Sequence, residues 1–162
     1  MSDDFEERLK SAIERGQRRG ERHDQAARAA HLTEEECKRL HTSYRLSLSE
    51  RIEKAIERVA QHFPGFRTEM LYGEVGWGAA AYRDDLLLVS GKRSNLYSRL
   101  EMTIRPLTSY HVLELRGKGT VANKELFNRN HFVPILEVDP DDFARLIDAW
   151  AIEYAESYAA RT

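Results

Sequence analysis

The segment VDPDDFARLIDAWAIEYAESYAA, residues 138–160, decides the fold that the sequence predicts. Asp139 is a favourable N-cap, and Pro140 suits the first helical position, where no backbone N–H is needed. The two carboxylates that follow would face the positive end of the helix dipole. A helix is therefore predicted over residues 140–159. Its largest apolar residues recur at spacings of three and four, so they line one side of that helix: Phe143, Leu146, Ile147, Trp150, Tyr154 and Tyr158.

A strand-like pattern between Phe66 and Thr120 offers a partner for that apolar side. In RLEMTIR, residues 99–105, Leu100, Met102 and Ile104 would share one face of a strand, while charged and polar residues occupy the other. The run VLELRGKG continues the alternation after a break. The sequence therefore predicts an α+β fold with N-terminal helices and one mostly antiparallel sheet of about five strands. The sheet would be covered by a helix over 50–63 and by the C-terminal helix over 140–159.

The faces of the two clearest strands also predict a register. If these strands form a hairpin that turns near residues 108–109, matched faces place Glu101 opposite Arg116 and Met102 opposite Leu115. This prediction depends on the side-chain faces alone, because Thr-Ser is not a strong two-residue turn.

The segments around these strands are less regular. Four unbroken apolar residues, LLLV at 86–89, predict a strand covered on both faces, after a turn at Asp84 and Asp85. The run KRSNLYSRL would be a connection with a short helical turn. Residues 120–136 would form an ordered loop or short helix that carries Phe127 and Phe132 inward. Whether the 117–131 loop is functional or structural stays open.

The order of elements that results, αβββαββα, is similar to that of small dimeric secretion-chaperone-like domains. The resemblance concerns the order of elements alone. It carries no shared motif and transfers no residue.

The N-terminal third is helical in character. Residues 1–32 predict a mobile, charged helical arm, because Gly16 and Gly20 weaken the helix and no apolar stripe continues beyond Ile13. Thr33 with Glu36 forms a capping box that starts the next helix. A helical pair, or one helix with a break near residues 46–49, fits residues 34–63 equally well. Residues 33–162 are therefore predicted to be a single α+β domain.

Composition bounds the class of protein. The chain has 162 residues, of which 41% are hydrophobic and 32% charged, and its formal net charge is −2. That size can bury the core of one domain. The single cysteine, Cys37, excludes an internal disulfide and fits a reducing compartment. No window resembles a signal peptide or a membrane span, so we expect a cytoplasmic protein without a membrane partner.

Searches for catalytic and metal-binding motifs fail on spacing. GKRS at 91–94 ends like a phosphate loop, but Leu86 stands where the first glycine should be. There is no H-E-x-x-H, paired C-x-x-C or G-x-S-x-G. Cys37 and His41 could share a helix face, yet a buried cysteine beside an interfacial histidine is the commoner arrangement. We expect no cofactor, no metal and no catalytic residue.

Residues 91–130 carry eight Lys and Arg against three Glu, interleaved with aromatic residues. This composition favours a surface for another chain or for an anionic ligand. The candidate ligand-binding or partner-binding residues are Arg93, Arg99, Arg116, Lys118, Asn123, Lys124, Arg129 and Asn130.

Three functional hypotheses follow from the sequence. The first is a non-catalytic protein-binding or adaptor module, chaperone-like in kind, that forms a homodimer. The alternative is binding of nucleic acid or an anionic ligand through the basic 91–130 sheet face and loop. The third is a small enzyme with its pocket under the 117–131 loop, near His111 and His131.

Overall fold

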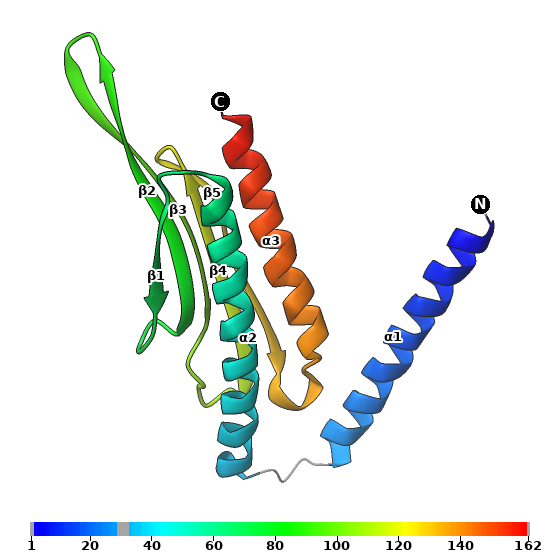
Figure 1. Cartoon of the computed structure of the whole chain (residues 1–162). Helices are drawn as coiled ribbons and strands as arrows, with labels where there is room; N and C mark the ends of the chain where they lie inside the picture. The colour runs from blue at the N-terminus through cyan, green and yellow to red at the C-terminus, as the bar shows by residue number, and fades with distance from the viewer. Residues whose placement is uncertain (1, 29–32, 162) are drawn as a thin grey trace.

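The protein has an α+β fold in which one sheet is covered on one face by two helices (Figure 1). The computed structural model describes the backbone of residues 2–28 and 33–161, and side chains within 4–24 and 33–161. The helices are α1 (Ser2–Arg28), α2 (Glu34–His62) and α3 (Pro140–Ala160). The strands are β1 (Arg67–Leu71), β2 (Trp77–Val89), β3 (Lys92–Ile104), β4 (Val112–Val121) and β5 (Lys124–Pro134), and a 3-10 turn, η1 (Ile135–Glu137), precedes α3.

The five strands form an antiparallel meander in the order β1-β2-β3-β4-β5. The predicted fold class and strand number are confirmed. The connection with a helical turn that was predicted for KRSNLYSRL is wrong, because these residues, 92–100, belong to β3 and pair with β2 along their whole length. The order αβββαββα, and with it the resemblance to secretion-chaperone-like domains, therefore does not hold.

The core lies between the sheet and the two helices. Leu100, Met102 and Ile104 of β3 are fully buried, as the alternation in RLEMTIR predicts. Phe143 and Ile147 of α3 meet them from the other side in the same cluster. The cap expected at Asp139 is present, since its carboxylate accepts a hydrogen bond of 3.1 Å from the Asp141 N–H. The C-terminal helix predicted from the sequence therefore closes the sheet.

Two glycines of β4 make room for the largest rings of α3. A Cβ at Gly117 would lie 2.5 Å from the Trp150 ring, and one at Gly119 would lie 3.0 Å from the Tyr154 ring. The strand backbone can therefore approach the helix closely. The Tyr154 hydroxyl donates a hydrogen bond of 2.8 Å to the Thr120 carbonyl, and burial raises the pKa of Tyr154 above its ordinary value.

The second covering helix, α2, is one continuous helix, so the structure contradicts both the helical pair and the break near residues 46–49. Its N-cap is Thr33, whose hydroxyl accepts a hydrogen bond of 3.2 Å from the Glu36 N–H, which is the N-cap half of the predicted capping box. The buried stripe of α2 includes Ile52 and Ile56, and it packs on β2, where Ala79 and Ala81 are buried. The small alanine side chains let the helix lie close to the strand.

The segment predicted as a loop or short helix is a strand. Residues 124–134 form β5, which follows a tight turn at Ala122 and Asn123, both with positive φ. Phe127 is buried as expected, but the expectation for Phe132 is wrong, because its side chain is exposed. Polar residues dominate this strand because it is the edge of the sheet, where water covers much of its surface.

The prediction for β3 and β4 is confirmed for the side-chain faces of the two strands and is wrong for their register. Glu101 pairs with Lys118 and Met102 pairs with Gly117, two residues from the expected partners. The connection is longer than a two-residue turn, because the strands stop at Ile104 and start again at Val112. A shift of two residues preserves the inward face, since side chains alternate with a period of two.

His41 of α2 is buried and ties the helix to the β3–β4 connection. Its Nε2 lies 3.0 Å from the Arg105 carbonyl oxygen, so the neutral ring donates a hydrogen bond from this nitrogen. Burial lowers the pKa of His41 below 6.5, and the nearby charge of Arg45 also lowers it, while the hydrogen bond to Arg105 opposes both. Cys37, one turn earlier, is also buried.

A bulky residue at Gly117 should destabilise the fold. Gly117→Val places methyl groups inside the Trp150 ring position, and overpacking of this kind costs about 3 kcal/mol. Urea unfolding followed by Trp fluorescence measures the loss. Lys118→Val, the next residue on the opposite face, is the matched control and should change the free energy of unfolding by less than about 1 kcal/mol. Equal losses in the two variants would contradict the close approach of Trp150 to β4.

The buried His41 should make stability depend on pH. Because its pKa is lowered in the folded state, its contribution is present above about pH 6.5 and is lost as pH falls through the folded-state pKa. His41→Gln keeps a donor for Arg105 but does not titrate. Between about pH 7.5 and 5.5, the variant should lose less free energy of unfolding than the wild type, by at most about 1.4 kcal/mol per pH unit. The exposed His62→Gln is the control and should follow the wild type.

Candidate functional site

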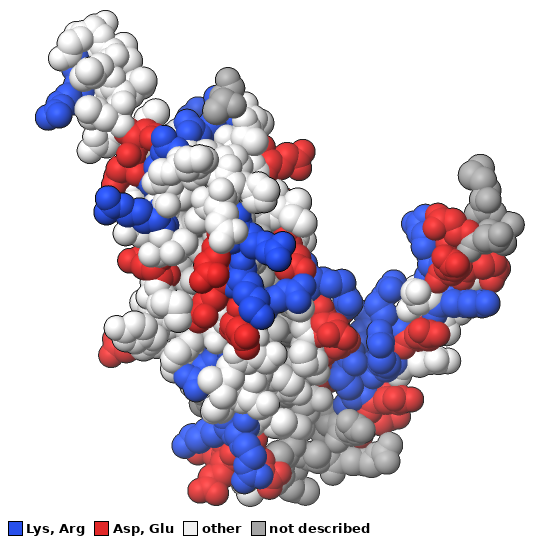
Figure 2. Space-filling view, viewed as in Figure 1, with Lys and Arg blue, Asp and Glu red and all other residues white. Residues whose placement is uncertain are grey.

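The far half of the β2–β3 hairpin projects beyond the body of the protein (Figure 1). On β2 it carries the four residues that the sequence predicted to be covered on both faces. That prediction is wrong, because Leu86, Leu87, Leu88 and Val89 are 53%, 43%, 67% and 56% exposed. In the space-filling view this projection is mostly white, with one basic patch (Figure 2). An apolar strand that no described part of the chain covers is a candidate contact surface.

The predicted turn at Asp84 and Asp85 is also wrong, because both residues lie inside β2. The chain instead turns at Ser90 and Gly91, both of which have positive φ, as tight two-residue hairpins require. The hairpin is thus a continuous ribbon. Its length places residues 86–89 beyond the ends of the covering helices (Figure 1).

The two strands of this ribbon differ in chemistry. The apolar residues of β2 pair with Asn95, Ser94, Arg93 and Lys92 of β3. Alternation along β2 sets Leu86 and Leu88 on one face of the ribbon and the other two apolar residues on the opposite face. Strand β1 pairs with β2 only as far as Tyr82. The outer edge of β2 beyond this residue therefore has no strand partner within the described chain.

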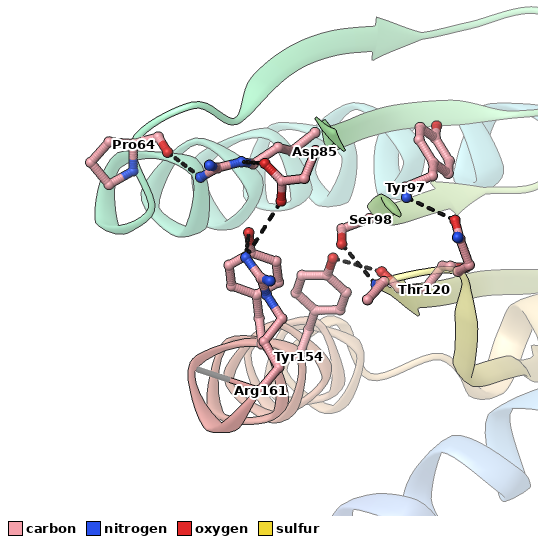
Figure 3. A network of polar contacts seen from close by, with 11 residues as sticks. Pro64, Asp85, Tyr97, Ser98, Thr120, Tyr154 and Arg161 are labelled. Atoms are coloured by element: carbon pink, nitrogen blue, oxygen red, sulfur yellow. Dashed lines mark hydrogen bonds and ion pairs between the residues drawn. The ribbon is translucent and has the colours of Figure 1, made fainter. Parts of the chain in front are cut away.

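A polar network holds the base of the hairpin on the α3 side (Figure 3). Arg83 donates hydrogen bonds to the Asp85 carboxylate, at 2.6 Å, and to the Pro64 carbonyl. Arg161, at the end of α3, lies 3.5 Å from the other oxygen of Asp85. The hydrogen bond with Asp85 raises the pKa of Arg83, so this guanidinium stays charged. These contacts fix the direction in which the ribbon leaves the body.

A second set of contacts holds the other strand of the hairpin. The Tyr97 N–H donates to the Asn123 side-chain oxygen, and the Asn123 amide donates to the Asn95 carbonyl, each at 2.8 Å. The Asn123 backbone N–H also donates to the Tyr97 carbonyl. The Ala122 N–H donates to the Ser98 hydroxyl at 3.0 Å (Figure 3). The β4–β5 turn therefore braces β3 where the ribbon begins.

The residues predicted to bind a ligand or partner do not gather at one place. Strand pairing puts Arg99, Arg116, Lys118 and Asn130 on the open face of the sheet. Asn123 and Lys124 lie at the β4–β5 turn, and Arg93 lies on the hairpin. Arg129 is paired at 2.8 Å with Glu153 of α3, on the other side of the sheet. The eight residues therefore divide among four parts of the surface.

The open face of the sheet carries basic residues whose charge acidic neighbours partly offset. Arg99 lies 2.8 Å from Glu69 and 3.3 Å from Glu101. Burial opposes its charge, but hydrogen bonds with Tyr97 and Glu69 and the charge of Glu101 raise its pKa above the ordinary value. The Asn130 amide donates to the carboxylate of Glu114. Acidic side chains therefore offset the charge of Arg99, one of the basic groups on which anion binding through this face would depend.

A cleft of about 860 Å³ lies between α1 and the start of α3. It contains His131, the histidine near which the sequence suggested an enzyme pocket, although the loop expected over it is a strand. Across the cleft, Arg22 lies 3.6 Å from Asp139, and His23 lies 2.9 Å from Glu137. These ion pairs attach the end of α1 to the body. Among the described residues, no cluster of three or more His, Cys, Asp or Glu is arranged to hold a metal ion.

Comparisons with protein-family models, with curated proteins and with solved structures found no match to this chain. Of the helices that the structure describes, none is both long enough and apolar enough for a membrane crossing.

Removal of the Asn123 side chain should loosen the hairpin. Asn123→Gly keeps the positive φ at no steric cost and deletes two hydrogen bonds, each contributing about 1 kcal/mol. Hydrogen exchange of residues 92–98 should accelerate while the core strands stay protected. Asn128→Ala, at an exposed position of β5, should leave the exchange of these residues unchanged. Unchanged exchange in Asn123→Gly would show that the turn does not brace the hairpin.

Proposed function

We propose that this protein is a non-catalytic protein-binding module of an adaptor or chaperone-like kind, and that the projecting β2–β3 hairpin contacts the partner. The observation that carries the proposal is the exposure of residues 86–89 on both faces of the ribbon. Burial of one leucine side chain contributes about 2 kcal/mol. A partner that covers this strand would therefore gain much of its affinity there.

The free edge of β2 supports a particular mode of contact. Beyond Tyr82 this edge has no strand partner in the described chain, so its backbone groups can pair with an added strand. Main-chain hydrogen bonds would give affinity, and the alternating apolar residues would select side chains on both faces. The partner is thus an extended, apolar polypeptide segment.

The fixed base of the hairpin also supports the proposal. Arg83, Asp85 and Arg161 hold one strand, and Asn123 holds the other. A ribbon held in one direction loses less conformational freedom on binding than a flexible ribbon does. The polar network at the base of the hairpin therefore favours a role of the hairpin in recognition, rather than a role as a connection between two strands.

The test compares two sets of exposed leucines. Leu86→Lys with Leu88→Lys removes apolar contact from the hairpin, whereas Leu46→Lys makes the same change at an exposed position of α2. Affinity capture of the tagged full chain from its own cells, with chemical cross-linking, identifies the partner. The hairpin variant should bind that partner at least a hundredfold more weakly, and Leu46→Lys should bind like the wild type.

Stability separates a loss of contact from a loss of fold. All three leucines are exposed, so each variant should unfold within about 0.5 kcal/mol of the wild type. If the hairpin variant keeps full affinity for the captured partner, the proposed role of residues 86–89 is wrong.

A further inference from the structure

A groove of about 760 Å³ opens to solvent between α2 and α3, and residues 86–89 of the hairpin are not part of its lining. Its lining includes three alanines, Ala55, Ala151 and Ala155, whose small side chains allow another backbone to come close. Phe63 and Ile152 also line it, and Ile152 is 66% exposed. The groove is therefore shaped for an apolar helix, and within the described chain no helix lies in it.

The same chain has an apolar helix face without a partner. Phe5, Leu9 and Ile13 recur every four residues on α1 and are 61%, 41% and 51% exposed. The other end of α1 is attached to the body through Arg22 and His23. The hydrogen bond and charge of Glu137 raise the pKa of His23, so its part of this attachment is fully present below about pH 6.5 and is lost as pH rises.

Attachment at one end keeps this face away from the groove of its own chain. Figure 1 shows α1 leading away from α2 and α3, with the N-terminus apart from the body. While Arg22 and His23 hold their partners, the apolar stripe can reach only another molecule. We infer that α1 of a second copy of this chain occupies the groove between α2 and α3.

The spacing of the two surfaces matches. The stripe from Phe5 to Ile13 follows the positions i, i+4 and i+8 on α1 and extends about 12 Å along it. In the groove, Ala55 and Val59 of α2 are four residues apart, as are Ala151 and Ala155 of α3, and Phe63 lies just past the end of α2. Rows of this kind are the ridges and grooves by which helices pack, and small residues such as Ala55 form the grooves.

The charges beside the two surfaces are also complementary. The α2 side of the groove carries Arg58 and the α3 side carries Glu156, and neither makes an ion pair within the described chain. On α1, Glu6 and Arg8 flank the stripe on opposite sides, and Arg8 also lies 3.9 Å from Asp4 on its own helix. One of the two orientations of α1 in the groove therefore sets Glu6 beside Arg58 and Arg8 beside Glu156.

Exchange of α1 between two copies gives a closed dimer. Each copy offers one stripe and one groove, so a two-fold axis fills both grooves and leaves no open contact for further growth. This contact differs from the pairing of a basic face with an acidic helix that the sequence suggested. It does not involve residues 86–89, so the dimer is independent of the proposed role of the hairpin.

The first measurement is the mass of the full chain by sedimentation and light scattering. The wild type should be a dimer, and Leu9→Glu on the stripe or Ile152→Glu in the groove should each raise the dimer Kd at least tenfold. Ser11→Glu, on the opposite face of α1, should leave the Kd unchanged, as should Leu88→Lys in the hairpin. Circular dichroism should show the same helix content in all variants, because each of the four positions is exposed.

Mixing the two weakened variants tests the exchange itself. A Leu9→Glu chain still has an intact groove, and an Ile152→Glu chain still has an intact stripe, so together they form one unaltered contact. Differently tagged variants should therefore form a heterodimer at concentrations where each alone is a monomer.

Three results would overturn the inference. The first is a wild-type monomer at high concentration, and the second is a dimer that survives both substitutions. The third is a mixture that stays monomeric although each variant dissociates, since that result shows that an intact stripe on one chain does not bind an intact groove on another.

Discussion

The close packing of two α3 rings against two glycines of β4 is the contact on which the rest of the structure depends. Trp150 and Tyr154 occupy the space that side chains at Gly117 and Gly119 would need. With these rings in place, α3 lies on the sheet, and α2 packs beside it against the alanines of β2. Because both helices use the same face, the other face and both ends of the sheet remain available to solvent or to partners.

The position of α3 also determines the base of the hairpin. Arg161, at the end of that helix, meets Asp85, while Tyr154 holds the carbonyl of Thr120 just before the turn that contains Asn123. The same helix that closes the core therefore orients the ribbon of residues 86–95. A surface that is apolar, exposed and held in one direction is a reason to propose recognition of another polypeptide.

Two apolar surfaces on the helices belong to a different contact. The stripe of α1 and the groove between α2 and α3 are each uncovered within the described chain, and they share one spacing. Their separation by the ion pairs of Arg22 and His23 makes a second copy the natural occupant. The molecule would then use its helices for self-association and its hairpin for another protein.

The sequence by itself determined the periodic parts of this protein. Alternation fixed the inward face of Leu100, Met102 and Ile104, and spacing with a good cap fixed α3, because both signals lie within a few adjacent residues. Only the tertiary structure decided the offset of β3 and β4, the strand at 124–134 and the exposure of Leu86 to Val89. A run of apolar residues shows that burial would be favourable. Whether anything covers that run depends on where the other helices and strands lie in the folded protein.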